Sequence, residues 1–194
     1  MNGAGGNGGG GAADCFKKGA IVEVSMDEEG FRGSWYSATV LGPVSKKTNK
    51  IYLEFHDLLA DDNRFLRDHL DILLLRPLPP RELHRSFLLG DDVDAYHNDG
   101  WWEGIVTQLL PPRPPPPPPP IPTISHPDRP TSTSTSTSTS TSTEAFRYYS
   151  VFFRCSREQL EFPETQLRLH REWVYGKWVP PLEPHDAHAP TTNN

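Results

Sequence analysis

Apolar and polar residues alternate along several short segments of this chain. Residues 21–24, 35–41 and 51–55 show the alternation most clearly. A period of two predicts β-strands, because successive strand residues point to opposite faces of a sheet. Polar turns and glycines separate the segments, and helical periodicity is nowhere sustained. The pattern therefore predicts an all-β fold.

The same succession of strands is written twice, each time with tryptophans beside acidic residues. Strands are expected at 21–24, 35–41, 51–55, 65–67 and 72–75, and again at 93–96, 102–109, 149–153, 159–162 and 166–169. Short strands joined by short turns favour small barrels, in which closure removes exposed sheet edges. The sequence therefore predicts two small SH3-like β-barrels in tandem, at 16–80 and 86–181. Because the connector 78–85 is short, we expect the barrels side by side, with a groove between them.

Three segments are too poor in apolar residues to join a core. They are the Gly-rich start (1–15), a proline run followed by alternating Thr and Ser (111–145), and the end of the chain (182–194). We expect all three to be disordered, the second as an insertion in the second barrel. Loop closure costs only about 0.6 kcal/mol for each doubling of loop length, so the insertion is compatible with a folded barrel.

Composition and charge narrow the range of functions. The 194 residues carry a net charge of −6, which argues against a domain that grips nucleic acid by neutralising phosphates. Acidic clusters at 27–29 and 91–94 favour a basic partner, although each cluster alone is equally well interpreted as a solvated loop. Cys15 and Cys155 are far apart and lack ligand-like neighbours, so we expect no disulfide, metal or cofactor and a reducing compartment. No apolar run reaches the roughly 18 residues of a membrane span, so no membrane association is expected.

The sequence lacks the common motifs of catalysis. It contains no Gly-rich phosphate loop, Cys-x-x-Cys pair, Gly-x-Ser-x-Gly elbow or His-Glu-x-x-His helix. His56 beside Asp57 is better interpreted as a loop pair than as an acid/base dyad. We therefore expect a binding module that is not an enzyme and has no small-molecule substrate.

Aromatic residues at the strand ends of the second copy predict a cage for a methylated ammonium group. Tyr96 closes one strand, Trp102 opens the next, Phe153 ends the third, and Asp99 lies in the intervening loop. Ring faces attract a cation through their quadrupoles, and antiparallel pairing is expected to bring these rings to one rim. Only one of Trp101 and Trp102 can line the site, because strand neighbours face opposite ways; we expect Trp102. Packing in a core or on a strand surface is the competing interpretation.

The first copy offers a weaker version of this cage. Its matching rings are Trp35 and Phe55, and the ring of the first strand is missing, although Phe31 or Tyr36 can substitute. We expect Trp35, Phe55 and Asp57 to make secondary contacts with a basic peptide. Further acidic residues of the second copy are expected to join them: Asp91, Asp92 and Asp94. Such contacts are needed, because three rings supply about 2 to 6 kcal/mol and micromolar binding requires about 8 kcal/mol.

Several motifs of the two copies are specific when they are taken together. They are Val22-Glu-Val24, Glu29-Gly-Phe31-Arg-Gly-Ser-Trp35, Ala38-Thr-Val40, Arg76-Pro77, Val93-Asp-Ala-Tyr96, Asn98-Asp-Gly-Trp101-Trp102, Phe153-Arg-Cys-Ser156 and Leu167-Arg-Leu-His170-Arg-Glu-Trp173. These motifs resemble plant Agenet domains, a branch of the Tudor-like barrels, from residue 16 to about 181. The resemblance implies a nuclear tandem Agenet protein that reads methylated lysine on histone tails, including marks of silenced heterochromatin. Carried over by position, the cage is Tyr96, Trp102 and Phe153.

Two alternatives remain open at this point. Related Agenet pairs also engage RNA, and aromatic faces can stack bases, although the acidic balance counts against this. The other alternative is a scaffold that binds another chromatin protein through the groove between the barrels, without a methyl cage.

Overall fold

The computed structural model describes residues 15–26, 28–80, 82, 85–114 and 145–182. Within this part of the chain the regular elements are β-strands and short 3-10 turns, so the predicted all-β fold is confirmed. The segments predicted to be disordered lie almost wholly outside the described residues.

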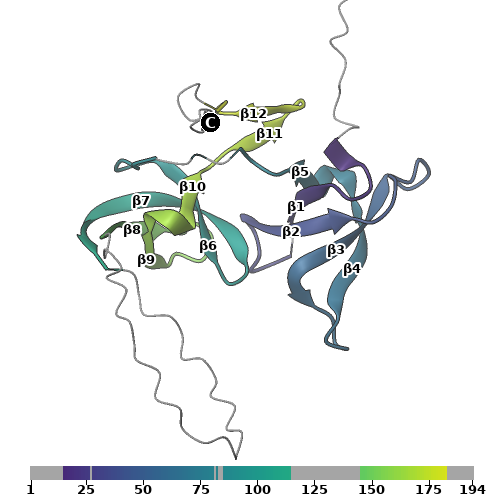
Figure 1. The fold of residues 1–194 in the computed structure, drawn as a ribbon, viewed down its shortest axis with the longest axis horizontal. Coiled ribbons are helices and arrows are strands. Elements are labelled where there is room, and N and C mark those ends of the chain that lie inside the picture. Colours follow the sequence, from purple (N-terminus) through teal and green to yellow (C-terminus); the bar gives the residue numbers. More distant parts are fainter. Residues whose placement is uncertain (1–14, 27, 81, 83–84, 115–144, 183–194) are drawn as a thin grey trace, which may run out of the picture.

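The first barrel is the half of the molecule drawn from purple to blue in Figure 1. Its elements are β1 (Ile21–Ser25), β2 (Ser34–Val40), β3 (Lys50–Leu59), β4 (Phe65–Asp71), the 3-10 turn Ile72–Leu74 and β5 (Leu75–Pro77). Strands β1 to β4 form an antiparallel meander, and β5 returns to pair with β1. The alternation in the sequence becomes alternation of burial. In β2, Tyr36, Ala38 and Val40 are buried in the core, whereas the residues between them are partly exposed.

The second barrel repeats this topology. Its elements are β6 (Asp92–His97), β7 (Gly100–Arg113), β8 (Phe146–Phe152), β9 (Gln159–Pro163), the 3-10 turn Glu164–Gln166 and β10 (Leu167–Leu169). Strands β6 to β9 pair in order, and β10 returns to β6 as β5 does to β1. Val93, Ala95, Val106 and Val151 centre its separate core. The repeat in the sequence is therefore a repeat of fold.

Several strand limits differ from the prediction: β3 and β4 continue to residues 59 and 71, and β8 runs from residue 146 to residue 152. Residues 72–75 are mostly not a strand, because Asp71 caps a 3-10 turn there by accepting a hydrogen bond from the backbone N–H of Leu73 (3.0 Å). Strand β7 continues past residue 110 to Arg113, which pairs with Phe146 and lays its guanidinium 3.9 Å from the ring centre of Tyr148.

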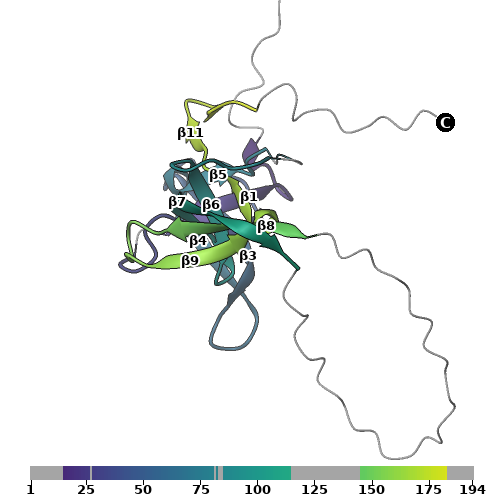
Figure 2. The same cartoon turned by 90° about the vertical axis from the view of Figure 1, so that its left-hand side faces the viewer.

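A hairpin that the pattern did not predict follows the second barrel. It consists of β11 (Glu172–Val174) and β12 (Lys177–Val179), and it stands above the barrel strands in Figures 1 and 2. The rings of Trp173 and Trp178 pack together across it, 5.1 Å apart.

The two barrels share a ladder, and we call this contact between β2 and β7 the seam. Strand β3 pairs with β2 only as far as Phe55 and then becomes irregular along β4. The remaining edge of β2 pairs with the start of β7, Ser34 with Trp102 and Trp35 with Trp101. One ten-stranded sheet thus runs through both barrels (Figure 1).

Candidate binding site at the seam of the two barrels

A buried network of charges lies along the seam. Each barrel supplies one carboxylate and one guanidinium from equivalent cross-strand pairs, Glu23 with Arg76 and Asp94 with Arg168. Arg76 lies 2.8 Å from Glu23 and 3.3 Å from Asp94, and Arg168 lies 2.5 Å and 2.9 Å from the same carboxylates. Nδ1 of His170 also donates to Asp94, at 2.6 Å. Both guanidinium groups therefore bridge the two barrels.

Asp94 is wholly committed to this network. Burial alone would raise the pKa of Asp94, but the hydrogen bond from His170 and the charges of Arg168 and Arg76 hold it below its ordinary value. The side chain has no exposed surface. The prediction that Asp94 contacts a peptide is therefore wrong.

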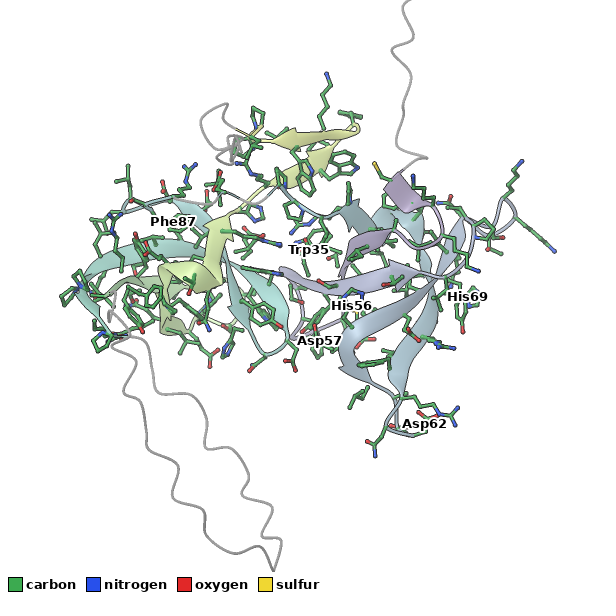
Figure 3. The ribbon with its side chains drawn as sticks, in the orientation of Figure 1. Trp35, His56, Asp57, Asp62, His69 and Phe87 are labelled. Atoms are coloured by element: carbon green, nitrogen blue, oxygen red, sulfur yellow. The ribbon has the colours of Figure 1, made fainter. Side chains whose placement is uncertain are left out.

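Two tryptophans are cross-strand neighbours in the seam, and each is covered by a guanidinium group. The Cζ atom of Arg76 lies 3.6 Å from the ring centre of Trp35, and that of Arg168 lies 4.1 Å from Trp101. Arg76 is also 5.6 Å from the ring of Trp178 in the C-terminal hairpin. A ligand cation would use the same cation–π attraction, so the chain's own arginine already occupies this face of Trp35. Figure 3 shows Trp35 between the barrels, as a seam residue rather than the predicted peptide contact.

A tight turn between β6 and β7 brings an acidic group to the seam. Asn98 and Asp99 both have positive φ, 46° and 61°, as a two-residue hairpin turn requires. A Cβ added to Gly100 would lie 2.9 Å from the ring of Tyr36, so the turn packs closely on the first barrel. Burial raises the pKa of both Tyr36 and Tyr96 most, and the charge of Asp99 raises both further, although a hydrogen bond with Ser34 partly offsets the shift at Tyr36. The charge of Asp99 therefore acts on both tyrosines.

On one face of the hairpin, Tyr96 is 37% exposed and its ring meets that of Trp101 edge-on, at 5.3 Å and 61°. Asp57 of β3 raises the pKa of Tyr96 more than Asp99 does, although less than burial does. Figure 3 shows Asp57 beside His56 on the side of the first barrel nearer the seam. Within the described part of the chain, no ion pair involves Asp57 or Asp99. The charges of two carboxylates from different barrels, neither of them in an ion pair with another described residue, thus act on an exposed tyrosine.

On the opposite face, Trp102 belongs to a group of three rings that spans the seam. Phe31, in the loop before β2, lies 6.4 Å from Trp102 and 6.3 Å from Tyr36. Phe31 is 42% exposed, Trp102 is half-buried and Tyr36 is buried. Nε1 of Trp102 donates to the carbonyl oxygen of His97 at 2.7 Å, which fixes the orientation of the indole. Two barrels therefore contribute rings to one partly exposed aromatic group.

The predicted cage of Tyr96, Trp102 and Phe153 is not assembled. Tyr96 pairs across the ladder with Trp101, so it faces away from Trp102. Phe153 is only 5% exposed and packs on Phe162 in the core, with ring centres 5.8 Å apart.

The predicted secondary contacts are also divided. Phe55 is 1% exposed and belongs to the first core, so it cannot reach a peptide. Asp91 accepts a hydrogen bond from the backbone of Leu88 (2.9 Å), and Asp92 pairs with Arg154 (3.0 Å). Both lie at the end of β6 opposite the Asp99 turn. Of the acidic residues in this set, only Asp57 lies beside the exposed rings.

Phe31 and Trp101 lie at the seam, although neither is among the residues that the sequence predicts to bind. The sequence predicts Phe31 only as a substitute ring for the first copy, yet it contacts Trp102 of the second. The sequence does show that Phe31 is an aromatic residue in an acidic loop next to a strand that contains a tryptophan. It does not show that Phe31 contacts the other copy, because that contact depends on the β2–β7 ladder.

The chain is similar in sequence and in fold to known proteins. The Agenet domain family matches residues 19–80. The crystal structure of Arabidopsis thaliana AGDP1 AGD34 superposes with a TM-score of 0.62 at 32% identity, covering 85% of this chain and 89% of that one. This chain is a plant tandem Agenet-domain protein. The crystal structure of ADCP1 tandem Agenet domain 3-4 is also similar, with a TM-score of 0.59, 30% identity and coverage of 85% and 87%.

The tandem Agenet chain is also similar in sequence to longer proteins. Protein AGENET DOMAIN (AGD)-CONTAINING P1 of Arabidopsis thaliana is 37% identical over 177 residues. The match covers 87% of the tandem Agenet chain but 28% of that relative, so the chain spans under a third of its length. DUF724 domain-containing protein 3 of the same species is 28% identical over 169 residues, with 84% and 19% coverage.

Tandem Agenet domains are modules that bind proteins and peptides. In the described part of this tandem Agenet chain, no three or more His, Cys, Asp and Glu side chains are grouped as a metal site would need. The same residues include no helix that is long and apolar enough to cross a membrane.

Proposed function

We propose that this tandem Agenet protein is a non-enzymatic chromatin reader in the nucleus that binds methylated lysine on histone tails. The observation that carries the proposal is the ring group of Phe31, Tyr36 and Trp102, together with the charge of Asp99, whose carboxylate has no ion-pair partner among the described residues. Membership of a peptide-binding family supports it. The cage proposed here differs from the one expected from the sequence, because it draws rings from both barrels.

In this proposal the methylammonium group lies against Phe31 and Trp102, the two rings with exposed surface. Ring quadrupoles favour a cation whose methyl groups have displaced water. Tyr36 forms the buried support of the site, and Asp99 supplies a negative charge near it.

Flanking residues of the peptide must supply the remaining affinity. Two rings contribute about 1 to 4 kcal/mol, whereas micromolar binding needs about 8 kcal/mol. Basic residues next to the methylated lysine are expected to meet Asp99 and Asp57, which have no partner among the described residues. Opposite charges of this kind set orientation and association rate as well as affinity.

The test is a calorimetric titration with histone-tail peptides that differ only in methylation of one lysine. Phe31→Ala should weaken binding of the methylated peptide by about 2- to 30-fold, the equivalent of losing one cation–π contact of about 0.5 to 2 kcal/mol. Phe65→Ala is the matched control, because Phe65 is also exposed but lies at the far end of the β3–β4 hairpin.

Two outcomes would contradict the proposal. One is equal affinity for methylated and unmodified peptides. The other is equal weakening by Phe31→Ala and Phe65→Ala. If the chain instead binds RNA with a steep salt dependence and no response to methylation, the RNA alternative replaces the histone reader.

A further inference from the structure

A cavity of about 490 Å³ lies on the second barrel, away from the proposed cage. Its walls come from the connector before β6, the start of β8, the 3-10 turn Glu164–Gln166 and β10. Phe87 lines this cavity, and Figure 3 shows it on the second barrel, far from Asp57. The volume is within the usual range for ligand-binding sites.

The charges behind this cavity do not balance. The carboxylate of Glu82 pairs with Arg85 at 3.3 Å and also with Arg171. The side chain of Glu82 is 4% exposed and that of Arg171 is 1% exposed, so little water screens that pair, whereas Arg85 is 30% exposed. One carboxylate therefore serves two guanidinium groups, and one positive charge is in excess.

The hydrogen bonds of the same group are also incomplete. The Nε atoms of Arg85 and Arg171 are buried and have no acceptor within the described part of the chain. A buried donor without a partner costs about 1 to 3 kcal/mol. An anion held against the exposed part of the Arg85 guanidinium would compensate the excess charge there.

The remaining charges of the cavity wall leave this excess in place. Arg168 lines the cavity, but its charge is used by Glu23 and Asp94. Arg147 adds a positive charge and Glu164 a negative one. Arg147 donates to the hydroxyl of Ser86 and has no ion-pair partner in the described residues, so it is available to a ligand.

We propose that this cavity binds an oxyanion on a side chain of a partner protein, with Arg85 and Arg147 as its ligands. Guanidinium groups match the planar fork of a carboxylate and the oxygens of a phosphate. Phe87 and Phe146 line the same cavity and offer apolar contact to the stem of the side chain. The partner is a peptide rather than a nucleic acid, because the site is a bounded cavity and the chain carries a net charge of −6.

The test follows the Nε–Hε signals of arginine by NMR while small probes are added at constant ionic strength. The probes are the N-acetyl amides of glutamate, phosphoserine and glutamine. We expect a saturable shift of the Arg85 signal with glutamate, phosphoserine or both, and none with glutamine. A response to phosphoserine alone identifies a phosphorylated partner segment, and a response to both identifies an acidic one.

Variants separate a built site from general attraction of anions. Arg147→Met should weaken binding of the probe that shifts the Arg85 signal by about tenfold or more, which is the scale of one charge-assisted hydrogen bond. Arg113→Met is the matched control, because Arg113 is an exposed arginine nearby on β7 that already pairs with Glu161 at 2.6 Å. Arg147 is exposed, so its variant is expected to fold even where Arg85→Met does not.

Three results would overturn the proposal. The first is an equal response to glutamine, and the second is unchanged affinity in Arg147→Met. The third is a shift of the Arg85 signal by a single-stranded oligonucleotide that is larger than the shift by any probe and that is lost in Arg147→Met. Binding of methylated histone peptides should be unchanged in Arg147→Met, so this test stands apart from that of the cage.

Discussion

Trp35 and Trp101 are a direct cross-strand pair in the ladder that joins the two barrels. They also occupy equivalent positions, since Trp35 pairs with Ser25 in the first barrel and Trp101 with Tyr96 in the second. Each indole is covered by the arginine of its own last strand. The repeated tryptophan is therefore a repeated interface residue, and its duplication follows from the near-twofold arrangement of the barrels.

Removing one arginine of the seam should destabilise the whole unit. Arg168→Met leaves Glu23 and Asp94 buried with a single guanidinium between them, and breaking such a buried pair costs about 3 to 5 kcal/mol. The free energy of unfolding, measured by urea denaturation, should fall by that amount. Arg64→Met is the control, because Arg64 and Asp62 are largely exposed and such pairs contribute about 0 to 1 kcal/mol. Equal losses in both variants would contradict the role assigned to the network.

Gly100 should not tolerate even one added methyl group. In Gly100→Ala the new Cβ would lie 2.9 Å from the ring of Tyr36, so the hairpin must shift away from the first barrel. We expect a loss of about 1 to 3 kcal/mol in the free energy of unfolding, as for other overpacked sites. Gly42→Ala is matched, because its Cβ would make only an ordinary contact with Tyr52 at 3.9 Å. A smaller loss in Gly100→Ala than in Gly42→Ala would refute the close packing.

His170 should make the seam less stable as pH rises. Burial lowers the pKa of His170, and the charge of Arg76 lowers it slightly. The hydrogen bond to Asp94 and the charges of Asp94 and Glu103 outweigh these effects and raise the pKa above its ordinary value of 6.5. The stabilisation is then complete below pH 6.5 and is lost as pH rises through the folded-state pKa. Unfolding free energies across this range should fall more steeply for the wild type than for His170→Gln. Parallel curves would show that His170 does not titrate with folding.

Asp99 and Asp57 should act differently on the two seam tyrosines. Asp99→Asn should lower the pKa of both Tyr36 and Tyr96, because the charge of Asp99 raises both. Asp57→Asn should lower that of Tyr96 alone. An alkaline titration of tyrosine Cζ signals by NMR measures each ring separately. A response of Tyr96 to neither substitution would remove Asp57 and Asp99 from the site.

Much of each barrel could be predicted from the sequence, because local alternation decides which strand residues enter a core. Val22, Val24, Val93 and Ala95 are all buried as the pattern predicts. The strand prediction fails from residue 72, because the side chain of Asp71 caps a 3-10 turn that the pattern of apolar residues does not reveal. The Agenet resemblance was equally readable from local motifs.

The predicted cage was less accurate, because it assumed that each copy builds its own site. Trp102 and Tyr96 are both at the seam, but the ladder turns them to opposite faces. Phe153 is drawn into the core beside Gly104, where a Cβ would lie 3.4 Å from its ring.

The sequence by itself determined two barrels of one family, because strand periodicity and turn residues are local properties of the chain. Only the tertiary structure decided which rings meet. The end of β3 leaves part of β2 unpaired, β7 completes that edge, and Phe31 thereby reaches Trp102 of the other copy. Such a contact depends on backbone hydrogen bonds between distant strands, which leave no periodic signal in the side chains.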